Sequence, residues 1–390
     1  MKILKLLIGL LLLVSCDKPE PIELKTYEPH QLHGRITSNK TLSKDTIWEL
    51  HNRVSVSEGA TLTIEPGTLI KAAPGTGSSA STLIIAKGSK IMALGTKEEP
   101  IIFTSMSEVS VGTRGMWGGV IILGEATGSF TGNVTEFQID GIPASDQIGL
   151  YGGNNDDDNS GIFKYVSIRH GGAEIGEGNE INGLTLGAVG RGTIIDNIEV
   201  VDNVDDGIEF FGGTVNATNL LVWGQGDDGI DIDQGYSGTI SNATVVLTDV
   251  SDPALEIDGP EGSNTGSFTL DSITVIGATE NCNALGVDGE VADFRKGATG
   301  ICSNVLIQGF ALGKDVELDN IADATSYTNG NLSFINWEVK QGCNITLIDI
   351  FKDRSNTSTF TQDASNFAFI TTNPTVGSNM DLQWTYYLNR

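Results

Sequence analysis

The sequence predicts an all-β fold, a parallel β-solenoid in which each coil holds three short strands. A motif of one polar residue, usually Asn, followed by alternating aliphatic residues recurs along the chain, and its closest copies, at Asn197 and Asn219, start 22 residues apart. The 390 residues include 49 Gly but only 10 Pro. This composition suits a fold with many tight corners better than a disordered segment, which would be rich in both Gly and Pro. Repeats too short to fold alone indicate coils that are stabilised by their neighbours.

The first 15 residues are predicted to be a secretory signal peptide. MKILKLLIGLLLLVS has a basic start at Lys2 and Lys5 and an apolar run over 6–14, which is too short to span a bilayer. The following junction, Leu13-Val14-Ser15-Cys16, resembles the lipobox of bacterial lipoproteins. That resemblance implies that Cys16 is acylated, and several acyl chains on one residue anchor a protein stably. The alternative is an ordinary cleavage site with an incidental Cys.

The remaining chain is divided into a tether and one folded body. Residues 16–30 are predicted to be the lipidated Cys and a polar tether that holds Pro19 and Pro21, and residues 31–390 a single β-helix domain. No second apolar run in the sequence is long enough to span a bilayer. We therefore expect the body to lie outside the cytoplasm.

Three strand positions recur in each predicted coil. Copies of the first strand start at Tyr165, Asn197, Asn219, Asn242, Ser272, Asn304 and Asn344. Copies of the second strand are 208–210, 230–232, 255–257 and 285–287, and copies of the third begin at Gly192, Gly213, Gly238 and Gly266. The runs 60–71, 81–92 and 100–105 extend the pattern toward the N-terminus. Alternation with period two predicts one buried face, and Asn suits a left-handed corner where it bonds to its copies above and below.

The charged residues narrow the range of possible functions. The chain has 50 acidic and 23 basic residues, a net charge of −27, which excludes a nucleic-acid partner bound through a basic surface. Acids concentrate on the second strand and on the turn before it. The strand positions are Glu209, Asp231, Glu256, Asp233, Asp258 and Asp288, and the turn positions are Asp205, Asp206, Asp227, Asp228 and Asp252.

Stacked coils would place these carboxylates on one side of the solenoid. Two such charges about 5 Å apart repel by roughly 1 kcal/mol even in water, so the stack needs cations or raised pKa values. Oxygen-only ligands suit Ca²⁺. The predicted Ca²⁺ ligands are Asp206, Glu209, Asp228, Asp231, Asp233, Glu256 and Asp258. The alternative is a set of solvated acids that keeps the surface soluble, and the acidic loop 154–161 is open to the same two interpretations.

The cysteines suggest one disulfide. Cys302 and Cys343 each lie just before a copy of the first-strand motif, so they fall near the same corner of successive coils. We therefore predict a bond between them, whereas Cys282 falls elsewhere in its coil. The four His residues are not clustered with the Cys residues in the sequence, which disfavours a Cys/His metal site.

A family resemblance adds expectations about the handedness of the β-helix and the location of the protein in the cell. The runs 61–105, 116–126 and 163–172 and the terminal Trp384-Thr385 resemble a family of Bacteroidota lipoproteins with right-handed parallel β-helix bodies of the pectate-lyase-like superfamily. The resemblance implies a cell-envelope protein held in the outer membrane by its lipid, with the body facing the exterior. The family carries no settled activity.

Catalytic chemistry is a second possibility. Gly226-Asp227-Asp228-Gly229-Ile230 is similar to the paired-Asp segment of polygalacturonase-type hydrolases, but the Gly-His-Gly and Arg-x-Lys segments of that family are missing. Asp205-Asp206 repeats the dyad one coil earlier, which indicates corner architecture. For a polysaccharide lyase, the available bases are Arg169, His170, Arg191, Arg295 and Lys296. The alternative catalytic set consists of Arg169, His170, Arg295, Asp227 and Asp228.

The sequence therefore favours a non-catalytic binding or assembly protein and leaves an enzyme open. Its expected partners are a glycan or an uptake system with a TonB-dependent transporter, and Trp117, Trp223 and Tyr236 are candidate contact residues or corner packing. The alternative function is a Ca²⁺-dependent polysaccharide lyase or glycoside hydrolase. Apart from Ca²⁺, no cofactor is expected.

Overall fold

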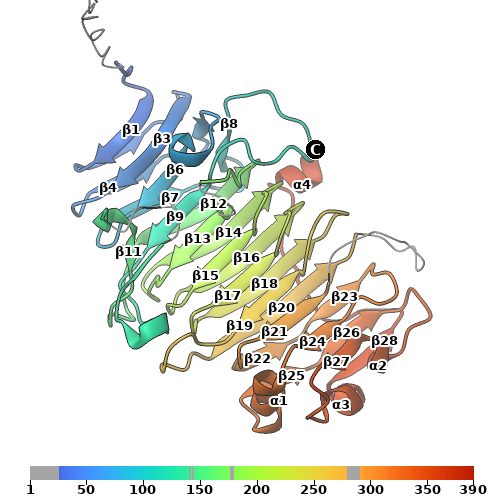
Figure 1. Ribbon diagram of the computed structural model, residues 1–390. Helices are drawn as coiled ribbons and strands as arrows, with labels where there is room; N and C mark the ends of the chain where they lie inside the picture. Colours follow the sequence, from blue (N-terminus) through green and yellow to red (C-terminus); the bar gives the residue numbers. More distant parts are fainter. Residues whose placement is uncertain (1–25, 140–141, 143–144, 176–179, 279–289) are drawn as a thin grey trace, which may run out of the picture.

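The computed structural model describes residues 26–139, 142, 145–175, 180–278 and 290–390. These residues wind into a right-handed parallel β-helix whose coils follow one another from β1 to β28 (Figure 1), as the sequence predicts. The predicted signal peptide, Cys16, Cys282, the strand 285–287 and Asp288 lie outside the described residues. Among the described residues, no helix has the length and apolar character needed to cross a membrane.

The elements follow one another in three groups along the axis. The first coils hold β1 (Gln31–Ile36), β2 (Lys40–Leu42), β3 (Trp48–Val56), β4 (Thr61–Ile64), β5 (Leu69–Ala72), β6 (Thr82–Ile85), β7 (Lys90–Leu94), β8 (Ile101–Ser105) and β9 (Val120–Leu123). The antiparallel pair β10 (Phe137–Gln138) and β11 (Leu150–Tyr151) forms a separate small sheet. The middle coils hold β12 (Gly161–Arg169), β13 (Leu184–Gly187), β14 (Ile194–Val201), β15 (Ile208–Phe211), β16 (Asn216–Trp223), β17 (Ile230–Asp233), β18 (Thr239–Val246), β19 (Leu255–Asp258) and β20 (Phe268–Ile276).

The last coils add short helices to the strands. Their strands are β21 (Ala292–Arg295), β22 (Gly300–Ser303), β23 (Leu306–Gln308), β24 (Val316–Leu318), β25 (Leu332–Ile335), β26 (Trp337–Lys340), β27 (Phe351–Asp353) and β28 (Ala368–Thr371). The helices are α1 (Ile321–Thr328), α2 (Leu347–Ile350), α3 (Phe360–Phe367) and α4 (Tyr386–Asn389). α1 and α3 lie at the C-terminal end of the stack (Figure 1).

Each middle coil consists of one long strand and one short strand. The long strands β12, β14, β16, β18 and β20 join the predicted third and first strands around an Asn, Tyr or Ser corner, and the short strands β13, β15, β17, β19 and β21 are the second. Ile198, Leu220, Ala243 and Ile273 pair in register and all lie in the buried core. The alternation of apolar and polar residues thus places one face of every strand inside the coil.

The polar column forms the predicted corner. Asn197, Asn219 and Asn242 all have a φ of +57°, a left-handed conformation that Asn adopts more readily than most other non-glycine residues. Asn219 Nδ2 donates to Asp196 Oδ1 at 2.7 Å, and Asn242 Nδ2 donates to Asn219 Oδ1. This column is scaffold, because Asn219 and Asn242 are bonded to the coil beside them and Asn197 Nδ2 donates to Asp196 Oδ1 in its own coil.

Replacing Asn219 should separate the backbone and side-chain contributions of the corner. Asn219→Ala loses the two ladder hydrogen bonds and forces an L side chain into the left-handed region, so we expect a loss of about 2–3 kcal/mol in unfolding free energy. Asn219→Gly loses the same bonds without backbone strain, and its expected loss is about half as large. Thermal unfolding followed by circular dichroism compares the two, and equal losses would contradict the corner assignment.

Two strand predictions require correction. Asn344 does not start a strand, because Thr346 and Asp349 form a capping box that begins α2. The last corner is Asn336, with a φ of +56°, and β26 follows it and pairs with β23. The predicted third-strand columns are also shifted, since Ala217 rather than Val215 pairs with Ile240. Loops of unequal length at the corners hide the register in the sequence.

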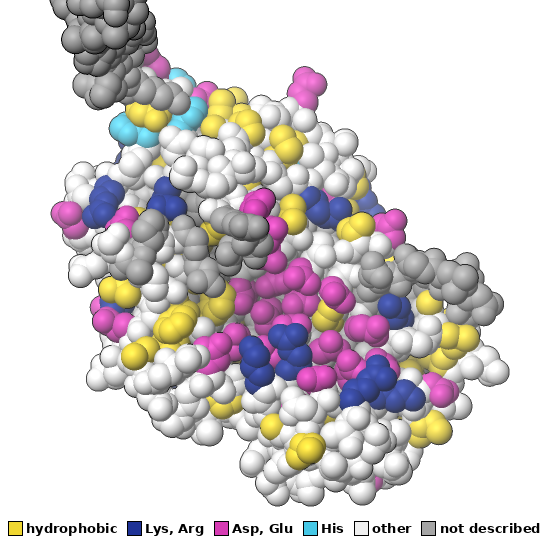
Figure 2. Space-filling view, viewed as in Figure 1, with side chains coloured by type: hydrophobic (Ala, Val, Ile, Leu, Met, Phe, Trp, Pro, Cys, Tyr) yellow, Lys and Arg dark blue, Asp and Glu magenta, His cyan; other side chains and the backbone are white. Residues whose placement is uncertain are grey.

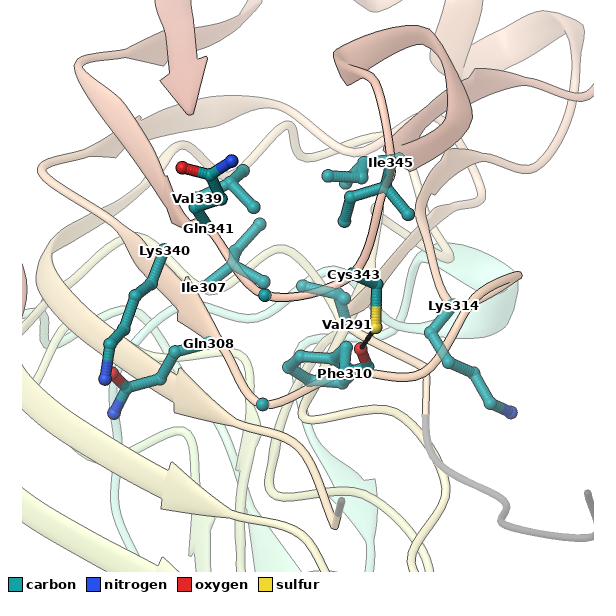
Figure 3. A pocket seen from close by; sticks show the side chains of 13 residues that line it. Val291, Ile307, Gln308, Phe310, Lys314, Val339, Lys340, Gln341, Cys343 and Ile345 are labelled. Atoms are coloured by element: carbon teal, nitrogen blue, oxygen red, sulfur yellow. Dashed lines mark hydrogen bonds between the residues drawn. The ribbon is translucent and has the colours of Figure 1, made fainter. Parts of the chain in front are cut away.

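The predicted Cys302–Cys343 disulfide is wrong. Cys302 is a free, buried thiol whose strand, β22, turns it toward the core beside Leu270 and Phe334. Cys343 is disulfide-bonded, and it lies in the loop after β26, where its Sγ is 3.3 Å from Phe310 O (Figure 3). That loop borders a mainly apolar cavity of about 210 Å³. The prediction paired the two Cys residues because both lie at a similar distance from a corner motif. In the structure one of them faces the core and the other does not.

The last residues, 372–390, form a C-terminal strap that returns along the outside of the coils. Ser378 N donates to Thr274 Oγ1 at 2.8 Å, and Asn379 N donates to Asn242 Oδ1 at 2.7 Å. Further along, side chains of the strap pack on the outer side of β14, β16 and β18. The contacting residues are Met380, Leu382, Tyr386 and Tyr387 on the strap and Val201, Leu221, Trp223 and Val246 on the coils. The strap brings α4 back to the middle of the stack (Figure 1).

Candidate functional site

Three successive short strands place carboxylates in one row. β15, β17 and β19 pair in parallel so that Glu209 lies beside Asp231, and Asp231 beside Glu256. Each of these acids alternates with inward aliphatic or aromatic residues, so the row points out of the coil. Figure 2 shows the acidic side chains gathered at the centre of this face, with Lys and Arg side chains next to them.

The turn before each strand adds a second set of acids. Gly207 N donates to Asp228 O at 2.8 Å, and Asp228 N donates to Asp206 Oδ1 at 3.0 Å, so the dyads 205–206 and 227–228 are stacked. The outer column continues at Asp252, whose N–H donates to Asp227 O at 3.1 Å. The inner column, in contrast, ends on both sides. Asn182 occupies the corresponding place one coil earlier, where Gly183 N donates to Asp206 O, and Pro253 one coil later, where it accepts from Gly229 N.

The two sets of acids face a groove of about 370 Å³. Its polar residues are Glu180, Asn182, Thr185, Asp205, Asp206, Glu209, Asp227, Asp228, Asp231 and Glu256, and its apolar residues are Ile121, Ile139, Ile175, Ile181 and Phe211. We call it the acidic groove. It has one carboxylate-rich wall and one aliphatic wall.

Carboxylate oxygens in the acidic groove are close enough to share a cation. One oxygen each of Asp206, Asp228 and Asp231 lie within 4.8 Å of one another, and the same holds for Asp205, Asp206 and Asp227. Oδ1 of Asp228 and Oδ1 of Asp231 are buried and have no hydrogen-bond partner among the residues that the structure describes. Because a buried, unpaired carboxylate oxygen is costly, these residues fit a bound cation with oxygen ligands.

The electrostatics of the groove point the same way. Burial, followed by the neighbouring Asp206, raises the pKa of Asp228 to about 12, and burial with Asp227 nearby raises the pKa of Asp205 to about 7. Burial and adjacent acids also hold the pKa values of Glu209 and Asp231 well above their usual range. The carboxylates must therefore bind protons or be neutralised by cations.

Basic side chains lie beside the acidic row near Glu256. Arg295, on β21, pairs with Asp258, and its Nε lies 2.7 Å from Asp258 Oδ1, while a second guanidinium nitrogen contacts Glu256. Lys296 Nζ lies 2.6 Å from Asp258 Oδ2. Although burial acts to raise it, these hydrogen bonds lower the pKa of Asp258.

The seven predicted Ca²⁺ ligands therefore fall into two groups, those that line the acidic groove and those that do not. Asp206, Glu209, Asp228, Asp231 and Glu256 line the acidic groove. Asp233 and Asp258 do not line it, because they face Lys296 and Arg295 instead.

Only some residues of the alternative catalytic set lie at the acidic groove. Asp227 and Asp228 line the groove and Arg295 lies beside it, but Arg169 and His170 do not line it. Arg169 Nε donates to Ser167 Oγ at 2.7 Å and its guanidinium covers the Tyr386 ring of the strap. His170 is buried, with Nδ1 2.8 Å from Thr113 O.

Some of the site was missed by sequence reasoning. The row continues at Asp293, which pairs with Glu256, and Arg295 takes the place beside Asp258. Asp288, which was predicted for that place, lies outside the described residues. Ala292-Asp293-Phe294-Arg295 has the same alternation as the other copies, which was the available signal. The aliphatic wall had no such signal, because Ile139 and Ile175 come from loops far away in the sequence.

Two further candidates are structural. Trp117, Trp223 and Tyr236 are 0%, 4% and 1% exposed, so they pack inside the protein and offer no contact surface. In the loop 154–161, Asp156 Oδ1 accepts from Thr127 N and Asp158 is buried beside Ser160. These bonds hold the loop against the neighbouring coil.

A right-handed parallel β-helix with an acidic groove on one side defines the class of this protein. The chain belongs to the family described as "Pectate-lyase like beta helix domain", whose model matches residues 34–386. This match confirms the superfamily predicted from the sequence, and the finer resemblance to Bacteroidota lipoproteins stays a prediction.

Comparisons with curated proteins and with solved structures add less information about the chain. No curated protein matches the chain. The solved structure "Crystal structure of Agl-KA catalytic domain" is similar over 83% of this chain, with 12% sequence identity and a TM-score of 0.30. The alignment spans 60% of the length of that structure.

Proposed function

We propose that the chain is a non-catalytic envelope protein whose acidic groove binds a divalent cation and, through it, an extracellular glycan or an uptake-system partner. The observation that supports this function is the convergence of Asp206, Asp228 and Asp231, whose ligand oxygens lie within 4.8 Å of one another. Two of these side chains present buried oxygens that have no hydrogen-bond partner in the described part of the chain.

Ca²⁺ is the cation that these ligands favour. It accepts six to eight oxygen ligands at about 2.3–2.6 Å in flexible geometry, whereas Mg²⁺ demands a nearly ideal octahedron and keeps several waters. Glu209 and Glu256 line the same groove and offer further oxygens. The ion also neutralises a face that would otherwise repel anionic ligands.

The basic residues support binding rather than turnover. A lyase needs a base beside the substrate, but Arg169 and His170 lie under or beside the strap and do not line the groove. The hydrogen bond from Arg295 to Asp258 raises the pKa of the guanidinium further. Arg295 therefore remains a cation at neutral pH and accepts no proton.

A lipid on Cys16 completes the proposal. With a net charge of −27, the chain has no electrostatic attraction to anionic lipids, so acyl chains on Cys16 supply the membrane affinity. The polar tether then holds the β-helix at the outer membrane with the groove accessible to extracellular partners such as a glycan or a TonB-dependent transporter.

Chelation should test the cation directly. In 1 mM Ca²⁺ we expect a melting temperature several degrees above that in excess EDTA, because an ion at about 100 times its dissociation constant adds about 2.7 kcal/mol. Asp228→Asn with Asp231→Asn should abolish this difference. The matched control is Asp157→Asn, since the Asp157 side chain is 80% exposed. An unchanged melting temperature of the parent protein in EDTA would refute the cation site.

A panel of uronate and neutral polysaccharides should identify the ligand. We expect binding that requires Ca²⁺ and is lost in the Asp228/Asp231 double variant, measured by affinity electrophoresis. Neither reducing ends nor unsaturated uronate absorbance should accumulate during incubation. Steady Ca²⁺-dependent product formation would replace the binding function with an enzymatic one.

One observation favours the second candidate, a Ca²⁺-dependent lyase or glycoside hydrolase. Burial raises the pKa values of Asp205 and Glu256 to about 7, and both line the acidic groove. A carboxyl group that is half protonated at neutral pH suits general acid catalysis. If the panel yields product, Asp205→Asn or Glu256→Gln should lower the rate at least 100-fold.

A further inference from the structure

The repeated Asp dyads of the acidic groove each divide into an inner and an outer member. Asp206 and Asp228 are buried, whereas Asp205 is half-buried and Asp227 is exposed. The dyads are one coil apart, because β15 pairs with β17. Successive residues on a turn thus build two layers of carboxylates, one at the floor of the groove and one at its mouth.

The two layers share one residue. The inner set of converging oxygens belongs to Asp206, Asp228 and Asp231, all buried, and the outer set to Asp205, Asp206 and Asp227. Asp206 has two carboxylate oxygens and takes part in both sets. A carboxylate in this position can bridge two ions, as in sites with metals about 3.5–4 Å apart.

We propose that the acidic groove holds two divalent cations bridged by Asp206, an inner structural ion and an outer ion that contacts the external ligand. This inference rests on the proposed cation-binding function and extends it. Beyond the clustering of acids, it is supported by the unpartnered Oδ1 atoms of Asp228 and Asp231, whose side chains are only 5% and 8% exposed and line the groove.

The charges in the groove exceed what one ion neutralises. Asp205, Asp206, Asp227, Asp228 and Asp231 supply five carboxylates, and none of them has a salt bridge among the described residues. Arg295, beside the row, is bonded to Glu256 and Asp258. Two divalent ions carry four positive charges against these five acids, and Glu180 and Glu209 add further carboxylates to the same groove.

The neighbouring coils limit the inner layer to one ion. Asn182 stands before Asp206 in the stack and Pro253 after Asp228, so the inner column contains two carboxylates only. Asp231, on β17, supplies the third oxygen. The inner column therefore does not continue as an open ladder of ions along the solenoid.

The two ion sites differ in how many coordination positions the protein leaves unfilled. All three inner ligands are buried, so the inner ion is enclosed by protein oxygens. The outer ion lies between a half-buried and an exposed carboxylate, and water or an external oxygen ligand must complete its coordination. The outer ion is thus the one that binds the carboxylate or hydroxyl oxygens of a glycan.

Calcium titration into EDTA-treated, dialysed full-length protein should show two sites whose dissociation constants differ at least tenfold. Asp231→Asn should remove the tighter site and the thermal stabilisation. Asp227→Asn should remove the weaker site and weaken glycan binding at least tenfold, while the thermal stabilisation by Ca²⁺ stays. Asp157→Asn should retain both sites.

Lanthanide ions give an independent readout that does not depend on any variant. With Tb³⁺ and Eu³⁺ bound together, we expect energy transfer between the two ions at a separation shorter than 6 Å, and Asp206→Asn should abolish it. A single Ca²⁺ site in the parent, or two sites without transfer, would overturn the bridged pair and leave the proposed function standing. Absence of any Ca²⁺ binding would overturn the proposed function itself.

Discussion

Replacing Glu199 by Ala should detach the C-terminal strap and lower the free energy of unfolding by about 3–5 kcal/mol. Glu199 is 0% exposed, and it accepts hydrogen bonds from Tyr386 N at 2.9 Å, Tyr387 N at 2.8 Å and Ser167 Oγ at 2.6 Å. Its charge also faces Arg169, which is half-buried. Removal of the carboxylate leaves two N–H groups without their acceptor and takes away the negative charge that faces Arg169.

The loss is measured by thermal unfolding together with Trp fluorescence, since Trp223 packs against Tyr386 and Tyr387 of the strap. We expect the Trp emission of Glu199→Ala to shift to longer wavelength before the coils unfold. Glu199→Gln keeps the size of the side chain and one acceptor oxygen but no charge, so its loss should be smaller than that of Glu199→Ala. An Ala variant with the stability and emission of the parent would show that the strap does not depend on Glu199.

The coil architecture was predictable because stacking imposes the same requirement on every turn. A corner with a φ near +57° favours Asn, and it recurs at Asn197, Asn219 and Asn242. Period-two alternation then fixes which residues face inward. The same repetition brought Glu209 and Asp231 together, since residues at equal distance from equivalent corners must lie side by side.

Features outside this repetition could not be derived in the same way. Glu199 and Tyr387 are 188 residues apart in sequence, and no periodic pattern relates them, so the strap was not anticipated. The position taken by β21 was also missed, because the length of the preceding loop is not fixed by stacking. Cys302 shows the same limit, since proximity to a corner does not determine which way a side chain points.

Within the site, the sequence identified the carboxylates but not their burial. Asp206 and Asp228 differ from Asp205 and Asp227 by one position, yet the first pair is buried while Asp227 is exposed. The apolar residues Ile139, Ile175 and Phe211 line the same groove as these acids. These residues come from three separate segments, so burial became visible only in the folded chain.

Without divalent cations, the protein should lose stability as the pH rises from 5 to 8. Burial raises the pKa values of Asp205 and Glu256 to about 7 and those of Asp233 and Asp293 to about 6, against about 4 in an unfolded chain. Between these values the folded state binds more protons than the unfolded state, so stability is present at low pH and decreases as the pH rises. The effect is on the order of 2 kcal/mol for each such group.

Melting temperatures in EDTA and in Ca²⁺ across this pH range provide the measurement. In EDTA the melting temperature should fall steadily from pH 5 to pH 8, whereas saturating Ca²⁺ should flatten the curve, because the ion replaces the protons that the groove releases. Asp205→Asn with Glu256→Gln removes two of the titrating groups and should reduce the slope in EDTA, while Asp157→Asn should keep it. A melting temperature in EDTA that rises over this range would mean that the groove carboxylates are ionised and stabilised without a cation, because salt bridges or hydrogen bonds then favour their charged form.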